Sequence, residues 1–336
     1  MRKLALALAV MAVVTAVGAW ALSGWIDQRL DQLYLSAPGG VADVEIKAGM
    51  AAREAAARLA AAGVVAEASD LVWWLWWTER AGDVQAGEYR FAAPVSVRHV
   101  ADVITQGRVR LYPVTLPEGS TRWQAAAAIV AAGFGVIDEA LAATERAELI
   151  VDLDPDADTL EGYLFPETYL VPAATSPAEI VALMVGAFRD AWTAERAARA
   201  EALGLGVRDV VILASLIEAE TTSPDERVMV SAVFHNRLER GMLLQTDPTV
   251  LYARWLAGKD GRTIYMSDLQ RDSPYNTYLY AGLPAGPIGS PRGASIHAAL
   301  YPAESGYLYF VSRNNGTHAF SLTLREHNES VNQYQR

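Results

Sequence analysis

Apolar and polar positions divide the chain into one unbroken apolar segment near the amino end and a long region with helical or strand periodicity. After Arg2 and Lys3, no charged residue occurs from Leu4 to Ile26. At ~1.5 Å per residue, a helix of this length crosses a hydrocarbon core of ~30 Å. The pattern therefore predicts a membrane-spanning helix over residues 1–26.

The orientation of this helix follows from its flanks. Arg2 and Lys3 precede the apolar segment, and Trp20 and Trp25 lie toward its far end. Positive residues remain on the cytoplasmic side, so we expect a cytoplasmic amino terminus and an exported remainder. A signal peptide cleaved near Ala21 is the alternative, although cleavable apolar regions run only ~7–15 residues.

A repeated pattern follows a predicted linker over residues 27–40. Val44 to Met50 aligns with Val114 to Ser120 at an offset of 70 residues, and both segments run into Ala-rich helices. We expect these helices to end at Gly63 and Gly133, because glycine is common just past a helix end. Each copy therefore predicts a strand, a turn and an amphipathic helix.

Four tryptophans lie between the two copies, on a helix predicted over Leu71 to Glu79. They are Trp73, Trp74, Trp76 and Trp77. We interpret them as core and inter-helix packing residues, with a platform for stacking sugars as the alternative.

The second half of the chain is predicted to be helical from Pro177 to about Leu203, with a second helix from Val207. The stretch Val210 to Ile217 is apolar on nearly every side, which predicts a buried helix. It runs directly into Glu218-Ala-Glu-Thr221.

The next helix has a start signal in its sequence. Ser223 is the expected N-cap, Pro224 the first helical residue and Glu226 the partner that completes a capping box. We expect this helix to end at Gly241. Loops with short strand candidates, such as Tyr307 to Ser312, make up the rest of the chain.

Composition excludes several kinds of chemistry. A length of 336 residues allows two domains, and a net charge of −11 argues against a nucleic-acid partner. The absence of cysteine excludes disulfides and thiolate chemistry. The five histidines show no spacing typical of metal ligands, and no motif for nucleotides or a serine nucleophile occurs, so we expect neither a metal nor a cofactor.

Two glutamates end the buried helix, where an ionised carboxylate without a partner is costly. Glu220 continues the i, i+3, i+4, i+7 stripe that begins at Leu213, and so lies at the edge of the buried face, whereas Glu218 falls on its flank. Partial burial would raise the pKa of Glu220 toward neutrality and keep it protonated, as a general acid requires. Two capped or salt-bridged glutamates that only close the helix remain the alternative.

Six ordered motifs resemble the endolytic murein transglycosylase family, the MltG/YceG-like proteins. They are Leu160 to Tyr169, Ala214 to Thr221, Val233 to Leu238, Gln245 to Thr249, Tyr275 to Tyr278 and Gly282 to Ile288. The carboxyl end, with His318 to Ser321 and Glu326 to Asn328, also resembles the family pattern. Ala219 and Ala285 depart from it, where Lys and Pro are usual, without removing a group needed for the chemistry.

The resemblance implies an α+β protein with an N-terminal transmembrane helix. A LysM-like region of βα repeats is expected over residues 41–112, and a mixed α/β YceG-like catalytic domain over residues 113–336. It also implies a single-pass protein of the bacterial cytoplasmic (inner) membrane, with its catalytic part in the periplasm. Peptidoglycan glycan strands are the implied substrate, and cell-wall synthases the possible protein partners.

The family's catalytic glutamate maps onto the pair Glu218 and Glu220, and we assign it to Glu220, with Glu218 as a supporting or second catalytic group. The implied reaction is lytic: the glutamate protonates the oxygen between N-acetylmuramic acid and N-acetylglucosamine. It then takes the proton of the muramoyl C6 hydroxyl, which closes a 1,6-anhydro ring. No water enters, so the second carboxylate of a hydrolase is not needed.

Six further residues of these motifs are substrate-binding candidates: Asn276, Tyr278, Glu161, Glu167, Asp247 and Gln245. Asp247 is equally well explained as a turn-forming residue. For Glu161 and Glu167, packing within their loop is the alternative to a place in the cleft. Two rival functions remain. One is a muramidase that uses water and takes Glu218, Glu161 or Asp247 as its second carboxylate, and the other is a catalytically silent glycan-binding scaffold of the cell-wall synthesis machinery.

Overall fold

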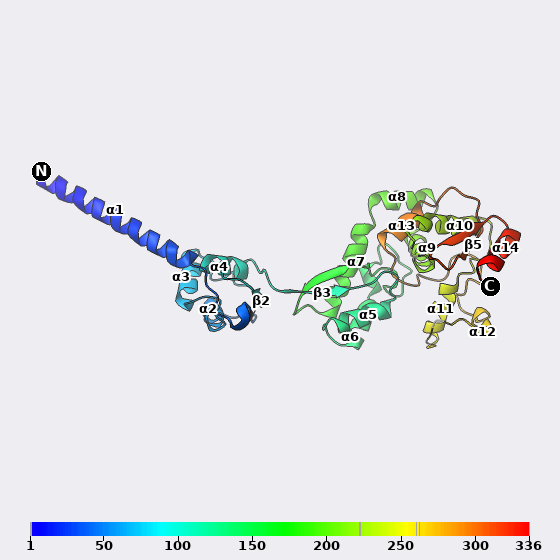
Figure 1. Ribbon diagram of the computed structural model, residues 1–336, viewed down its shortest axis with the longest axis horizontal. Coiled ribbons are helices and arrows are strands. Elements are labelled where there is room, and N and C mark those ends of the chain that lie inside the picture. The colour runs from blue at the N-terminus through cyan, green and yellow to red at the C-terminus, as the bar shows by residue number, and fades with distance from the viewer. Residues whose placement is uncertain (1, 222, 260, 262, 336) are drawn as a thin grey trace. The chain divides into compact units, whose positions relative to one another are not determined.

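The computed structural model describes residues 2–221, 223–259, 261 and 263–335. It mixes helices with short strands, which confirms the predicted α+β class (Figure 1). The chain divides into two compact units, one of residues 1–112 and 172–174, the other of residues 113–171 and 175–336.

The first unit begins with the helix α1, Arg2–Asp31. Among the described residues, α1 is the one helix long and apolar enough to cross a membrane, from Leu6 onward. The predicted apolar helix is thus confirmed, but it continues into the segment expected to be a linker. Its last turn joins the folded unit, where Leu30 is buried in the core.

The body of the first unit consists of a two-stranded sheet and three helices. Its elements are β1 (Ala42–Ile46), α2 (Ala52–Ala61), α3 (Ala68–Trp77), β2 (Gly87–Phe91) and α4 (Val97–Thr105), with a 3-10 turn at Pro38–Gly40. β1 and β2 are antiparallel, with Val44 opposite Tyr89. Alternate residues of β1 are buried, so the sheet has one face on the core.

Each copy of the repeated sequence pattern forms a strand followed by a helix. β1 and α2 correspond to β3 (Leu111–Thr115) and α5 (Arg122–Ala131). Gly63 and Gly133 follow the two helices with φ of 74° and 96°, a conformation that favours glycine. The copies do not pair with each other, because β1 pairs with β2 whereas β3 pairs with β4 (Thr168–Pro172).

The interpretation of all four tryptophans of α3 as core residues is wrong. Leu71 and Leu75 are the fully buried residues of this helix. Trp76 and Trp77 are 77% and 70% exposed and Trp73 is 40% exposed, so only Trp74 packs against the core. The two leucines, four residues apart, fill the narrow inward stripe and leave the bulkier rings outside.

The second unit is mainly helical, and α9 (Val207–Glu220) lies in its interior. α9 packs against α8 (Ala194–Ala202), α10 (Arg227–Glu239), α11 (Asp247–Leu256) and α13 (Gly293–Leu300) (Figure 1). Every residue from Val210 to Glu218 is buried, as the apolar pattern predicts. The helix ends because Thr221 is extended, with φ of −142°.

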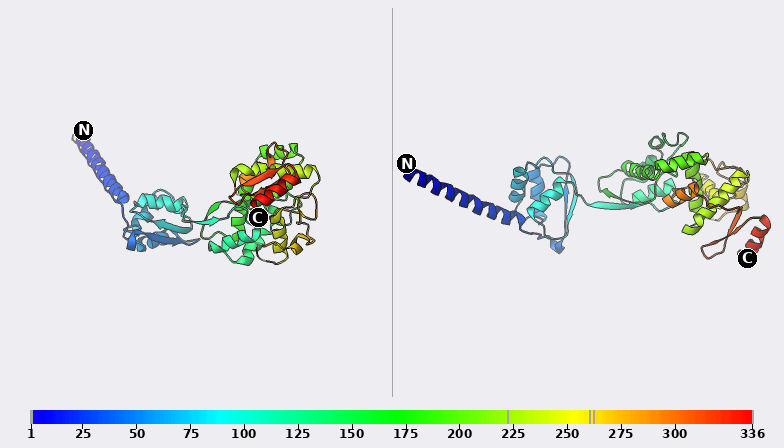
Figure 2. Two further views of the ribbon diagram at one scale, coloured as in Figure 1. Left: turned by 45° about the vertical axis from the view of Figure 1, so that its right-hand side comes forward. Right: turned by 90° about the horizontal axis from the view of Figure 1, so that it is seen from above.

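The remaining elements of this unit surround that core. They are α6 (Ile137–Thr144), a 3-10 turn at Ala147–Leu149, α7 (Pro177–Ala191), α12 (Met266–Leu269), β5 (Tyr309–Ser312), β6 (His318–Ser321) and α14 (Leu324–Tyr334). β5 and β6 form an antiparallel hairpin that packs on α14 (Figure 2). β5 thus confirms the strand candidate over Tyr307 to Ser312.

Two predicted helix boundaries are wrong. The helix expected from Pro177 to Leu203 is interrupted at Trp192, and the Thr193 side chain caps α8 as a new helix. Ser223 makes no side-chain cap, and Pro224–Glu226 is a 3-10 turn that leads into α10. The Glu226 carboxylate accepts instead from the backbone N–H and ring Nδ1 of His318, so a tertiary contact replaces the capping box.

Two of the sequence motifs meet at Gly162, which has a φ of +84°. A Cβ atom here would lie 2.5 Å from Cβ of Pro287. Only glycine fits both the backbone conformation and this close approach. The contact holds the motif at residues 160–169 against the one at residues 282–288.

Candidate active site

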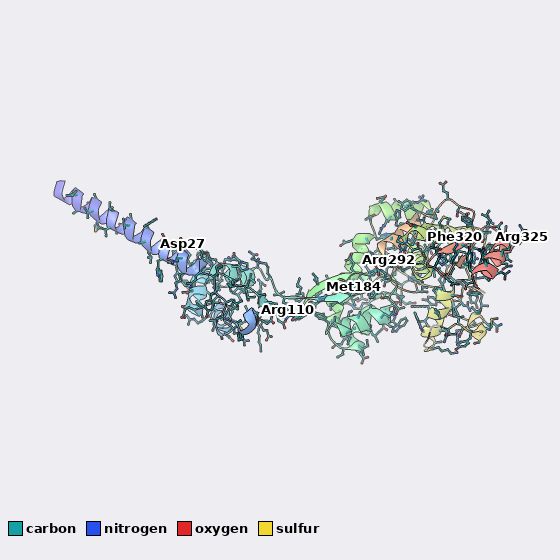
Figure 3. The ribbon with its side chains drawn as sticks, in the orientation of Figure 1. Asp27, Arg110, Met184, Arg292, Phe320 and Arg325 are labelled. Carbon is teal, nitrogen blue, oxygen red and sulfur yellow. The ribbon has the colours of Figure 1, made fainter. Side chains whose placement is uncertain are left out.

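A cavity of ≈ 340 Å³ lies at the carboxyl end of α9. Residues from α9, α10, the start of α11 and the segment leading into it, the loop between α12 and α13, β5 and α14 line it. They are Glu220, Arg237, Leu244, Gln245, Thr246, Asp247, Tyr278, Tyr309, Phe310, Leu324 and His327. Figure 3 labels Phe320 on β6 and Arg325 on α14, which mark the elements beside it.

Glu220 is the last residue of α9 and presents its carboxyl group to this cavity. The hydroxyl of Thr246 donates a hydrogen bond to its Oε1. Desolvation by the surrounding protein raises the pKa of Glu220 to about 7. The Thr246 bond and the electrostatic influence of His318 and Arg237 oppose this shift, whereas the nearby Asp247 carboxylate adds to it.

A carboxyl group with a pKa near neutrality can both donate and accept a proton at physiological pH. Glu220 therefore has the property that a single acid and base needs. Its position at the end of a buried helix explains this, since the apolar stripe brings the side chain out of water while the helix end opens onto the cavity.

Asp247 and Tyr278 form a second polar group in the cavity. The Tyr278 hydroxyl donates to Oδ1 of Asp247 at 2.6 Å. Asp247 is exposed and is the first residue of α11, where a negative charge at a helix amino terminus is favourable. Asp247 is thus both a helix-start residue and a cavity residue.

Arg237 and His327 complete the polar lining. The Nε–H of Arg237 donates to the carbonyl of Leu308 at 2.7 Å and its Nη1 to the carbonyl of Leu244 at 2.8 Å, so the guanidinium is fixed. The His327 ring stacks on Tyr309 with centroids 5.2 Å apart. Desolvation, and then the charge of Arg237, lower the pKa of His327, which favours its neutral form.

Glu218 has different surroundings from Glu220. Its carboxylate accepts from the backbone N–H of Arg292 at 3.1 Å, from the Arg292 guanidinium at 2.9 Å and from the Ser295 hydroxyl at 2.8 Å. It is buried and does not line the cavity. These contacts tie α9 to the start of α13, where Figure 3 labels Arg292.

The structure places Glu161 and Glu167 away from the cavity at Glu220. Glu161 is 5% exposed and accepts from the backbone N–H of Arg122 at 3.2 Å and the Tyr252 hydroxyl at 3.0 Å. Burial raises its pKa to about 7 as well. Glu167 lines a separate cavity of ≈ 630 Å³ together with Arg196.

Asn276 and Gln245 also differ in their placement. Asn276 is 1% exposed, and its amide donates to the carbonyls of Leu269 and Arg271, so it holds its own loop together. Its amide is therefore not directed at the cavity. Gln245 is exposed at the cavity with a φ of 48°, a rare conformation for a residue other than glycine.

Several cavity residues were not singled out from the sequence: Arg237, Thr246, Tyr309, Phe310 and His327. Arg237, Thr246 and His327 do belong to segments that carried the family resemblance. The signal for them was therefore present, but nothing in the local pattern distinguished a cavity residue from a packing residue. Within the described ranges, no group of three or more His, Asp or Glu side chains is arranged to hold a metal ion.

Comparison with known proteins agrees with this arrangement of motifs. Residues 44–333 match the YceG-like family. The chain belongs to this family, whose pattern covers both units described above.

Three relatives illustrate the match. A Bacillus subtilis protein named endolytic murein transglycosylase is 35% identical over 273 residues, 76% of this chain and 74% of that protein. A Streptococcus pneumoniae protein of the same name is 33% identical over 178 residues, and this chain covers 32% of its length. A crystal structure of a yceG-like protein from Listeria monocytogenes matches with a TM-score of 0.59 and 31% identity, covering 86% of this chain and 98% of that one.

Proposed function

We propose that this protein is an endolytic lytic transglycosylase, which cleaves the bond between N-acetylmuramic acid and N-acetylglucosamine within peptidoglycan strands. The observation that carries this proposal is the carboxyl group of Glu220, which opens onto a cavity with its pKa raised to about 7. The name of the Bacillus subtilis relative supports the choice of substrate and reaction.

Glu220 serves as both acid and base in this mechanism. Its proton passes to the glycosidic oxygen as the bond from that oxygen to the muramoyl C1 breaks. The resulting carboxylate takes the proton of the muramoyl C6 hydroxyl, whose oxygen bonds to C1 and closes the 1,6-anhydro ring. The glutamate is protonated again at the end, so the cycle needs neither water nor a cofactor.

The other cavity residues bind and orient the sugar. Gln245 and Tyr278 supply amide and hydroxyl groups for sugar hydroxyls and N-acetyl groups, and Asp247 fixes the Tyr278 ring. Tyr309 and Phe310 offer aromatic faces to the sugar rings. Asn276 acts through the loop that it stabilises.

A water-using muramidase is supported less well, because it needs a second carboxylate near the bond. Glu218 is neutralised by Arg292, and Glu161 is buried outside the cavity. Of the three carboxylates, Asp247 lines the cavity. It accepts a hydrogen bond from the Tyr278 hydroxyl, and we assign it to positioning that ring for sugar binding.

The apolar helix α1 supports a single-pass anchor in the bacterial cytoplasmic membrane, with the catalytic unit in the periplasm. Cleavage would then occur in nascent strands beside the membrane, where cell-wall synthases are the natural partners. The region of residues 41–112, proposed to be LysM-like, would tune the engagement of glycan or partner without contributing to the chemistry.

Digestion of purified sacculi by the full-length protein in detergent tests the proposal. We expect soluble muropeptides to be released by the wild type and not by Glu220→Gln. The matched control is Glu148→Gln, which removes an exposed carboxylate from the same unit. If wild type and Glu220→Gln both bind sacculi and release nothing, the protein is a glycan-binding scaffold and the proposal fails.

A further inference from the structure

The exposed tryptophans of α3 form a surface that the proposed chemistry does not use. Trp76 and Trp77 are 77% and 70% exposed, and the rings of Trp73 and Trp77 stack with centroids 5.6 Å apart. Exposing three indole rings on one helix is costly in water. Such a surface is typical of a face that is covered by another phase or molecule.

The carboxyl end of α1 lies directly beside this surface. A groove of ≈ 750 Å³ separates the two helices. Leu22, Trp25 and Ile26 of α1 line one wall, and Trp73, Trp74 and Trp77 of α3 line the other. The last apolar turns of the proposed anchor and the tryptophans of α3 therefore lie at the same level along α1.

Ion pairs join α1 to both α3 and α4. Nε of Arg29 lies 2.8 Å from Oδ1 of Asp70 on α3. Arg98 on α4 pairs with Asp27, and its guanidinium lies 4.7 Å above the Trp74 ring. Leu30 is also buried in the core, so the last turn of α1 is part of the folded unit.

From this geometry we infer that the surface of Trp73, Trp76 and Trp77 docks on the headgroup layer of the phospholipid bilayer that α1 spans. The inference rests on the proposed anchor. Ile26 is the last apolar residue before the charged residue Asp27, which places this level of α1 at the edge of the hydrocarbon. Tryptophan is the residue that best combines an apolar ring with a wet N–H at that depth.

The docking holds the first unit against the membrane instead of leaving it on a free tether. Figure 3 labels Asp27 near the end of α1 and Arg110 on the opposite side of the same unit. Lys47 lies on this side too, because it follows Ile46, the last residue of β1, which pairs with Gly87 of β2. The next residue of β2, Glu88, accepts a hydrogen bond at its backbone carbonyl from the N–H of Arg110. Lys47 thus marks the side of the unit expected to face away from the bilayer.

Site-specific quenching in nanodiscs tests the inference, using the full chain. Because the chain has no cysteine, single cysteines can carry a fluorescent label. We choose Trp76→Cys on the surface, Lys47→Cys as the matched exposed control and Val14→Cys within α1. The quenchers are a lipid nitroxide near the headgroup, a lipid nitroxide near the acyl end, and aqueous iodide.

We expect the label at position 76 to be quenched by the headgroup nitroxide several-fold more than the label at position 47, and to be shielded from iodide. Replacing Trp73 and Trp77 with Ser in the Trp76→Cys protein should reduce the lipid quenching and expose the label to iodide. The label at position 14 should respond to the nitroxide near the acyl end.

Three results would overturn the inference in distinguishable ways. Lipid quenching at position 14 with equal iodide access at positions 76 and 47 leaves the anchor standing but removes the docking. No lipid quenching at position 14 removes the anchor and the docking together. Shielding at position 76 only after glycan fragments are added shows a sugar-stacking surface instead.

Discussion

The hydroxyl of Thr246 donates a hydrogen bond to Oε1 of Glu220, at the start of the segment that also supplies Asp247. The two neighbours act on Glu220 in opposite directions. The hydroxyl stabilises the ionised carboxylate and lowers its pKa, whereas the Asp247 charge destabilises it and raises the pKa. Their balance with desolvation sets the value near 7.

The activity of the wild type is therefore expected to fall as pH rises through about 7, because the first step needs the proton of Glu220. Thr246→Val should move this alkaline limb to higher pH, since it removes a bond to the ionised form. Asp247→Asn should move it to lower pH, since it removes a like charge. The measurement is the pH profile of kcat/KM on soluble glycan strands.

Tyr278→Phe is the control for this pair, because it removes the hydroxyl bound to Asp247 and keeps the carboxylate. Tyr278→Phe should weaken the binding of glycan strands without moving the alkaline limb of the pH profile. Shifts of the same sign in Thr246→Val and Asp247→Asn would contradict the assignment of the limb to Glu220.

A second prediction links Glu220 to stability. Its folded-state pKa lies above the usual 4.5. The contribution of Glu220 to the free energy of unfolding is therefore fully present below pH 4.5 and is lost as pH rises through about 7. Glu220→Gln should match the wild type in stability at low pH and exceed it above neutrality by about 3 kcal/mol, since one pKa unit is worth ~1.4 kcal/mol and the pKa rises from 4.5 to about 7.

Urea unfolding of both proteins across this pH range measures the difference. Glu161, whose pKa is also raised to about 7, is present in both proteins and cancels from the comparison. A difference independent of pH would show that Glu220 is not desolvated in the folded protein.

A third prediction separates Glu218 from Glu220. Glu218→Gln weakens an ion pair with Arg292 whose carboxylate side is only 4% exposed, so it should lower the free energy of unfolding by about 2–3 kcal/mol. Activity should fall only in part, because α13 shifts while Glu220 remains. The control Glu148→Gln breaks an exposed pair with Arg146 and should leave the free energy of unfolding nearly unchanged, since exposed ion pairs contribute little.

Loss of all activity in a fully stable Glu218→Gln protein would instead make Glu218 the acid. This outcome would reverse the roles of Glu218 and Glu220. The measurement is the unfolding midpoint of each variant together with its activity on sacculi.

A fourth prediction concerns topology. A periplasmic reporter fused at the carboxyl end should be active and a cytoplasmic one silent, with Met1 to Ile26 retained in the mature protein. The reason is the pair Arg2 and Lys3 ahead of the apolar helix α1. A soluble protein trimmed near Ala21 would contradict it, and mass spectrometry of the purified protein decides.

Local pattern predicted the elements that depend on periodicity. The buried helix α9, its end at Glu220, and the repeated strand and helix follow from apolar spacing and glycine placement. These features are short-range, because a helix face and a helix end are set by neighbouring residues.

The sequence pattern gave wrong predictions where a contact between residues far apart in the chain determines the local structure. Glu226 binds His318, which lies 92 residues away, and this contact replaces the predicted capping box. Asn276 is a polar loop residue by sequence, yet its amide is used by the carbonyls of its own loop. No spacing rule predicts either outcome, because the partner is brought in by the tertiary fold.

The exposure of the α3 tryptophans could not be predicted from hydrophobicity either. Leu71 and Leu75 occupy the inward stripe, whereas hydrophobicity alone predicts core positions for Trp76 and Trp77 as well. Hydrophobicity alone cannot distinguish a core residue from an exposed apolar residue, because the two have the same side chains.

The chemistry of the new chain end tests the central claim most directly. Sacculi are digested by the full-length protein in heavy-oxygen water, and the released muropeptides are weighed by mass spectrometry. Intramolecular closure by Glu220 predicts 1,6-anhydromuramoyl ends that lack the mass of one water and carry no heavy oxygen, and none of these products from Glu220→Gln. Reducing ends that carry heavy oxygen would contradict the account and identify a muramidase.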